Sequence, residues 1–166
     1  MNILFVCCAN VSRSFLAENL LKRELEKENI NDISVASAGL NTFDLNEPDR
    51  KMVAHLSKIG IPKVDHRPKQ ISKQDADWAN IILVMETDHA KKIMQLWPEV
   101  KPKLQVFGRF VSAGPSIDDI IDPFGKSSYH YRLAQSQITL AINNFVQLLL
   151  MKPQKGAKFT KIQTAP

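Results

Sequence analysis

The chain has 166 residues, of which 44% are hydrophobic and 23% are charged, so it has the size and composition of one globular domain. Its net charge of +5 is spread over scattered lysines, except in residues 152–166, and no aromatic-rich stripe accompanies them, so we do not expect nucleic acid as a partner. The apolar run at residues 3–6 is too short for a signal peptide or a membrane span. We expect a cytoplasmic protein that does not bind membranes, and we take it to be a monomer.

Short apolar runs alternate with longer amphipathic segments along the chain, which predicts alternating strands and helices. In chain order they are a strand at 3–6, a helix at 14–27, a strand at 33–37, a helix at 48–59, a short helix at 72–80, a strand at 81–85, a helix at 88–96, a strand at 104–107 and a helix at 127–149.

This alternation predicts a doubly wound α/β fold, in which a four-stranded parallel sheet is flanked by helices in a single domain. The domain is expected to cover residues 1–151, and residues 152–166 are expected to form a basic tail without a core of its own. Such sheets bind their ligands at the carboxyl ends of the strands. The segment that follows the first strand is therefore the first place to look for a site.

That segment has the composition of an anion-binding loop. It consists of Cys7, Cys8, Ala9, Asn10, Val11, Ser12, Arg13 and Ser14. Unpaired backbone N–H groups converge where a loop enters a helix, and the helix dipole adds positive potential at the same place. We therefore expect the loop to bind a phosphate group, and inorganic phosphate or sulfate to be able to occupy it.

Cys7 and Arg13 stand at opposite ends of this loop and would face each other across a small cradle. Helix N-termini and nearby cations favour the thiolate form of cysteine, which is the nucleophilic form. The planar arginine fork can bind two phosphate oxygens at once. Ser14 begins the helix, where its hydroxyl can donate to the thiolate or cap a free N–H group. The pattern predicts a nucleophile beneath a bound oxyanion.

The string Cys7-x5-Arg13-Ser14 directly after the first strand resembles the low-molecular-weight protein tyrosine phosphatases, and the resemblance covers about residues 1 to 150. It implies hydrolysis of phosphotyrosine and aryl phosphate monoesters through a phosphocysteine intermediate. The implied partners are phosphotyrosine proteins or small aryl phosphates. No cofactor or metal is implied, and the four histidines are dispersed along the sequence.

Thiolate attack on a phosphate ester needs a proton for the departing oxygen. Asp122 is the candidate donor, because the resembling family carries its general acid in an Asp-Pro-aromatic turn after the fourth strand. Asp118 and Asp119 are rival carboxylates in the same segment. The acid would then serve as the general base for the water that hydrolyses the phosphocysteine.

The resemblance also implies which side chains surround the loop. The expected loop supports are Asn10, Ser14, Ser37 and His66. The expected substrate wall consists of Phe43 and Phe124, although either phenylalanine could instead belong to the core. A nucleophile at the bottom of such a cleft is reached by a long phenyl phosphate and not by a short phosphoserine.

The chain departs from the family pattern at several positions. Family loops commonly read C-x-G-N-x-C-R-S-P, whereas this loop has Ala9, Ser12 and Phe15 in place of the glycine, the second cysteine and the proline. Gly125 stands where many relatives have a second aromatic residue. A bond between adjacent cysteines would be strained, so we expect free thiols and an oxidation of the nucleophile that proceeds toward irreversible forms.

Two other functions fit the same residues. An arsenate reductase of this fold would relay a disulfide through later cysteines, and because no cysteine follows Cys8, such an enzyme would need an external thiol. Alternatively, the chain could be a phosphate-binding regulatory module that has lost turnover through the changes at Ala9 and Phe15.

Overall fold

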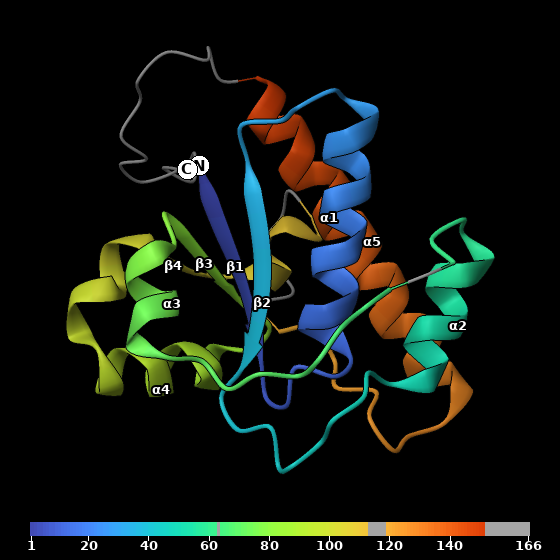
Figure 1. Ribbon diagram of the computed structural model, residues 1–166, viewed down its shortest axis with the longest axis horizontal. Coiled ribbons are helices and arrows are strands. Elements are labelled where there is room, and N and C mark those ends of the chain that lie inside the picture. The colour runs from blue at the N-terminus through green and yellow to red at the C-terminus, as the bar shows by residue number, and fades with distance from the viewer. Residues whose placement is uncertain (63, 113–118, 152–166) are drawn as a thin grey trace.

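The computed structural model describes residues 1–62, 64–112 and 119–151, and it has the alternating architecture predicted from the sequence (Figure 1). The strands are β1 (Asn2–Cys7), β2 (Ser34–Gly39), β3 (Ile81–Val84) and β4 (Leu104–Val106). The helices are α1 (Arg13–Lys27), α2 (Arg50–Lys58), α3 (Lys73–Trp78), α4 (Thr87–Leu96) and α5 (Ser128–Leu150), with short 3-10 helices η1 (Pro98–Lys103) and η2 (Phe107–Phe110).

The strands form one sheet in the order β2-β1-β3-β4, and all neighbouring pairs are parallel. The predicted four-stranded parallel sheet flanked by helices is therefore confirmed. Strand β1 has neighbours on both sides, and its residues 3–6 are fully buried. This explains why the first strand reads as an unbroken apolar run.

Successive side chains of β1 enter two separate cores, because side chains alternate across a strand. Ile3, Phe5 and Cys7 belong to the core under α1, α2 and α5, whereas Leu4 and Val6 belong to the core under α3 and α4. Figure 1 shows these two groups of helices on opposite faces of the sheet. The alternation places the side chain of Cys7 on the α1 side, where the loop turns into that helix.

Several boundaries differ from those expected from the sequence. Strand β2 extends to Gly39, which pairs with Cys7, so the sheet reaches the site at both strands. Helix α2 begins at Arg50 and not at Pro48, because the carboxylate of Asp49 accepts a hydrogen bond from Lys51 N at 2.8 Å and caps the helix. Phe107 begins η2 and does not end β4, and η1 was not predicted.

Gly39 allows the loop after β1 to lie directly against the end of β2. A Cβ atom at this position would lie 2.8 Å from both the carbonyl carbon of Ala9 and the carbonyl oxygen of Cys8. These are backbone atoms that cannot swing away, so a side chain here would displace the loop. The last residue of β2 therefore helps to set the position of the site.

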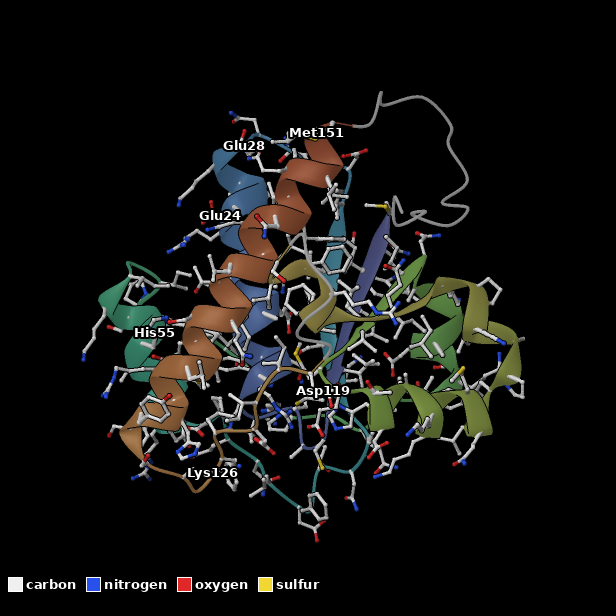
Figure 2. All side chains as sticks on the ribbon, turned by 180° about the vertical axis from the view of Figure 1, so that it is seen from behind. Glu24, Glu28, His55, Asp119, Lys126 and Met151 are labelled. Atoms are coloured by element: carbon white, nitrogen blue, oxygen red, sulfur yellow. The ribbon has the colours of Figure 1, made fainter. Side chains whose placement is uncertain are left out.

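The C-terminal ends of α1 and α5 lie far from this loop (Figure 2). Glu24, Glu28 and Met151 lie at one end of the molecule, and Asp119 and Lys126 lie toward the other end (Figure 2). The basic tail of residues 152–166 and the rival acid Asp118 lie outside the described residues. Within the described part of the chain, no helix is both long and apolar enough to cross a membrane.

Candidate active site

A pocket of about 400 Å³ opens at the carboxyl end of β1, beside the N-terminus of α1. It is lined by Cys7, Cys8, Ala9, Val11, Ser12, Arg13, Phe43, Leu45, Asp122 and Phe124. The pocket thus combines residues of the predicted phosphate loop, both predicted wall residues and the predicted acid. Its volume lies within the range of small-molecule sites, about 300 to 1,000 Å³.

Cys7 contributes a sulfur that is buried but reaches this pocket. Its side chain is 3% exposed, and its Sγ lies 3.0 Å from Ser14 Oγ and accepts a hydrogen bond from Asn10 N at 3.3 Å. The sulfur therefore faces a backbone N–H group of the loop and a hydroxyl in the first turn of α1.

Asn10 is the centre of the network that holds the loop in shape. Its φ of 61° is in the left-handed region, which asparagine tolerates better than most residues. Its Nδ2 donates to Ser14 Oγ at 3.0 Å and to Ser37 Oγ at 2.7 Å, and its carbonyl oxygen lies 2.8 Å from His66 Nε2. The structure thus brings together all four side chains that were expected to support the loop.

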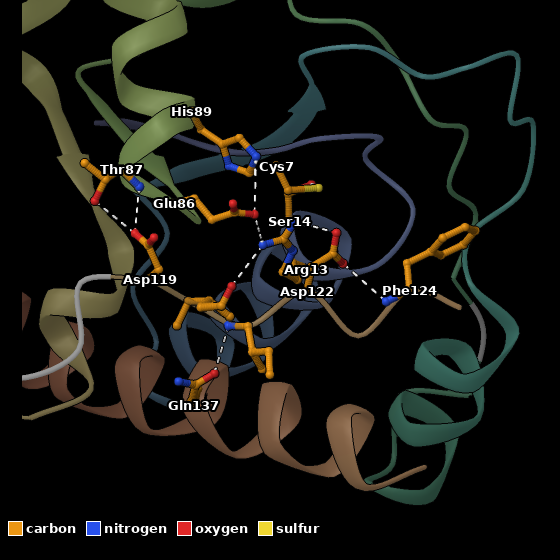
Figure 3. A network of polar contacts seen from close by, with 12 residues as sticks. Cys7, Arg13, Ser14, Glu86, Thr87, His89, Asp119, Asp122, Phe124 and Gln137 are labelled. Carbon is orange, nitrogen blue, oxygen red and sulfur yellow. Dashed lines mark hydrogen bonds and ion pairs between the residues drawn. The ribbon is translucent and has the colours of Figure 1, made fainter. Parts of the chain in front are cut away.

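Arg13 is almost fully buried, with a side chain that is 2% exposed, and its guanidinium is held from several directions (Figure 3). Nη1 donates to a carboxylate oxygen of Glu86 and, at 2.9 Å, to the carbonyl oxygen of Ile120. Nη2 lies 3.0 Å from Asp122 Oδ2. A buried cation needs such partners, because desolvating an unpaired charge is costly.

Asp122 is placed beside Arg13 and Cys7, as the predicted proton donor should be. Its carboxylate also accepts a hydrogen bond from Phe124 N at 3.2 Å, and its side chain remains 43% exposed. The rival Asp119 accepts hydrogen bonds from Thr87 N at 2.7 Å and from Thr87 Oγ1 at 2.9 Å, away from the sulfur (Figure 3). The geometry therefore favours Asp122 as the acid.

Phe43 and Phe124 stand at the mouth of the pocket and are not part of the core. Their side chains are 60% and 50% exposed, and both line the pocket together with Val11 and Leu45. Apolar rings and side chains around a polar floor suit a ligand with a charged end and an apolar body.

Sequence reasoning missed Asp49, which connects the loop to two helices. Asp49 caps α2, and its Oδ2 accepts hydrogen bonds from Ser12 Oγ at 2.7 Å and from Tyr131 of α5 at 2.5 Å. Burial and the hydrogen bond to this carboxylate raise the pKa of Tyr131 well above its ordinary range. An aspartate before a helix signals a cap, but nothing local in the sequence reveals the other two contacts.

Sequence reasoning also missed Glu86, which lies just after β3 and forms an ion pair with Arg13. It follows the most apolar strand of the chain by two residues, and that position at the carboxyl end of a central strand is the available signal. Among the described residues, no group of three or more His, Cys, Asp and Glu side chains could hold a metal ion.

We predict that peroxide inactivates the protein and that thiol treatment does not fully restore its activity. Ser12 stands where the resembling family commonly has a second loop cysteine; it is hydrogen-bonded to Asp49 and offers no thiol for a disulfide with Cys7. Burial and the nearby Cys7 raise the pKa of the Cys8 thiol, so Cys8 is a poor nucleophile for resolving an oxidised Cys7. Activity after dithiothreitol treatment and mass spectrometry of the Cys7 peptide measure the outcome. A Cys8→Ser variant should recover no less, whereas complete recovery with a trapped Cys7–Cys8 bond would contradict the prediction.

Comparison with known proteins supplies independent findings. A family model described as "Low molecular weight phosphotyrosine protein phosphatase" matches residues 2–155. A protein-arginine-phosphatase of Geobacillus stearothermophilus is 33% identical over 147 residues, which cover 89% of this chain and 95% of that protein. The low molecular weight protein-tyrosine-phosphatase PtpA of Staphylococcus saprophyticus is 29% identical over 150 residues, covering 89% of this chain and 95% of that protein.

Solved structures give the same result for the fold. The crystal structure of the tyrosine phosphatase AmsI from Erwinia amylovora has a TM-score of 0.78 and 27% sequence identity, and the match covers 89% of this chain and 91% of that one. The relatives thus include one described as a protein-tyrosine-phosphatase and one described as a protein-arginine-phosphatase.

Proposed function

This chain belongs to the low molecular weight phosphotyrosine protein phosphatase family, and from that premise we propose that it hydrolyses phosphotyrosine and aryl phosphate monoesters through a phosphocysteine. The single observation that carries the proposal is the shared pocket of Cys7, Arg13 and Asp122, in which the guanidinium contacts the carboxylate. Cytoplasmic conditions would keep both thiols reduced, and both are free in the structure.

The first chemical step transfers the phosphoryl group to sulfur. The Cys7 thiolate attacks phosphorus, the S–P bond forms, and the bond from phosphorus to the ester oxygen breaks. Asp122 gives its proton to the departing oxygen, which leaves as the free phenol.

The second step regenerates the enzyme. Asp122, now a carboxylate, accepts a proton from a water molecule that attacks the phosphocysteine. The S–P bond breaks, inorganic phosphate is released, and Cys7 returns to the thiolate. Throughout both steps, Arg13 and the loop N–H groups bind the phosphoryl oxygens, so positioning and electrostatic stabilisation supply most of the rate enhancement.

The shape of the pocket supports an aromatic substrate. Cys7 lies at the floor of the pocket and is only 3% exposed, and the apolar side chains of Phe43, Leu45 and Phe124 form the mouth above it. A phenyl ring separates the phosphate of phosphotyrosine from its backbone, whereas phosphoserine has one methylene in that place. The longer side chain matches this depth.

Phosphoarginine is the second candidate substrate, because the 33% identical relative from Geobacillus is described as a protein-arginine-phosphatase. Its phosphate is also carried on a long, flat group, and Asp122 could protonate the departing guanidine nitrogen in place of a phenolic oxygen. The mechanism through Cys7 would otherwise be the same.

The test is hydrolysis of one peptide sequence prepared with phosphotyrosine, phosphoserine or phosphoarginine. We expect kcat/KM for phosphotyrosine to exceed that for phosphoserine by about a hundredfold or more, which corresponds to about 2.7 kcal/mol of transition-state stabilisation. Equal values would remove the depth argument. A clear preference for phosphoarginine would keep the cysteine mechanism and replace the substrate.

A further inference from the structure

Glu86, which forms an ion pair with Arg13, lies outside the phosphate loop. Glu86 precedes α4 and contacts Nη1, the same nitrogen that donates to the carbonyl oxygen of Ile120 (Figure 3). The other terminal nitrogen, Nη2, lies on the pocket side against Asp122. One edge of the guanidinium is therefore fixed by the scaffold, and the other edge is directed toward the place where a phosphoryl group would bind.

Backbone hydrogen bonds fix the segment that carries Glu86. Met85 N donates to Val6 O at 3.0 Å, one residue before Cys7, and Ile120 N donates to Met85 O at 2.8 Å, two residues before Asp122. The loop, Glu86 and the acid-bearing segment are thus tied to one another through Met85. A carboxylate on so rigid a base can position a catalytic side chain reproducibly.

His89 is the second member of the arrangement and has no other evident task. It lies in the first turn of α4, is 5% exposed, and directs Nε2 to within 3.5 Å of Glu86 Oε1. Its Nδ1 is buried and lacks a hydrogen-bond partner in the described structure. An unsatisfied buried nitrogen lowers the stability of the fold, and an apolar residue in this place would avoid that cost.

Burial favours the neutral form of the His89 ring. It is the main cause that lowers the pKa of His89; the carboxylates of Glu86 and Asp122 oppose this effect, and the cations Arg13 and Lys92 add to it. A neutral ring that carries its proton on Nε2 presents that N–H to Glu86 and leaves Nδ1 as the unpaired acceptor. A stabilising contact with Glu86 would offset the cost of the unpaired nitrogen.

On the basis of the proposed phosphatase activity, we propose that Glu86 and His89 are positioning residues: Glu86 holds Nη1 of Arg13, and the Nε2–H of His89 holds the Glu86 carboxylate. The pair would orient the arginine fork before the phosphoryl group arrives. Its contribution should appear mainly in the transition state, where the equatorial oxygens must meet the fork in one fixed geometry.

The decisive experiment compares His89→Leu with His89→Gln in the full chain. Glutamine places an amide N–H near the position of Nε2, whereas leucine fills the space without a donor and removes the unsatisfied nitrogen. We expect His89→Leu to lower kcat on p-nitrophenyl phosphate about tenfold with little change in KM, and Glu86→Gln to lower it about a hundredfold. His89→Gln should stay within about twofold of the wild type.

Two further measurements separate positioning from stability. The Ki of vanadate, which resembles the transition state, should rise in parallel with the loss of kcat, while the Ki of inorganic phosphate should rise less. The melting temperature of His89→Leu should equal or exceed that of the wild type. The matched control is Asp88→Asn, which removes an exposed carboxylate from the same turn of α4, paired with Lys91 and not with Arg13, and it should leave all values unchanged.

The outcomes are distinct for the two proposals. If the wild type is active and His89→Leu matches it, or if glutamine is the worse substitution, the positioning role is wrong. Should His89→Leu fail to fold, His89→Asn replaces it, because its amide lies near Nδ1; equal activity of the asparagine and glutamine variants would then overturn the role. A wild type that hydrolyses none of the phosphate esters overturns the proposed function instead.

Discussion

Replacing Cys7 with serine is expected to abolish hydrolysis of p-nitrophenyl phosphate, with kcat reduced by a factor on the order of 10⁴ or more. A serine hydroxyl is not ionised near neutral pH and needs an adjacent base to become a nucleophile. The groups that contact the sulfur in this structure, the Ser14 hydroxyl and the Asn10 N–H, are not bases. The variant should therefore bind substrate without cleaving it.

Retained binding is what distinguishes loss of the nucleophile from loss of the site. Arg13 and the backbone N–H groups of the loop remain in the Cys7→Ser variant, so the variant should still bind a phosphotyrosine peptide. Calorimetry should give a dissociation constant for this peptide that is equal to or lower than that of the wild type for the product, inorganic phosphate. The neighbouring Cys8→Ser change should cost far less activity. Substantial hydrolysis by Cys7→Ser would place the nucleophile elsewhere.

The fold could be predicted because its signals are local. Residues 3–6 and 81–84 are buried on both faces of the sheet, and that burial requires the unbroken apolar runs seen in the sequence. The exact ends depend on contacts that the pattern does not contain. β2 extends to Gly39 because it pairs with β1 as far as Cys7, and α2 starts late because Asp49 caps it.

From the residues alone, the site was predictable to the extent that it is contiguous, and distant residues such as Ser37 and Asp122 were expected only from the family resemblance. Cys7, Asn10, Arg13 and Ser14 lie in one strand–loop–helix segment; Cys7, Asn10 and Ser14 share one hydrogen-bond network, and Arg13 lines the same pocket as Cys7. The contact between Arg13 and Glu86 depends instead on strand order, because β3 lies beside β1 although β2 comes between them in sequence. No local sequence pattern shows which carboxylate the strand order places beside Arg13.

Replacing Asp122 with asparagine is expected to lower kcat on a phosphotyrosine peptide by a factor of about 10² to 10⁴, the usual contribution of a general acid. Asparagine has nearly the same shape and can still accept a hydrogen bond from Arg13, but it cannot give up a proton to the departing oxygen. The loss should be smaller for p-nitrophenyl phosphate, because its leaving group needs less protonation. The ratio of the two losses measures proton transfer directly.

The matched control is Asp119→Asn, which changes the same kind of side chain three residues earlier. Asp119 accepts its hydrogen bonds from Thr87, and an asparagine oxygen can still accept them, so this variant should remain close to the wild type on both substrates. Equal losses on the two substrates in Asp122→Asn would show that Asp122 shapes the site without donating a proton. A larger loss of kcat in Asp119→Asn than in Asp122→Asn would assign the role of acid to Asp119, although its carboxylate contacts Thr87 of α4 in this structure.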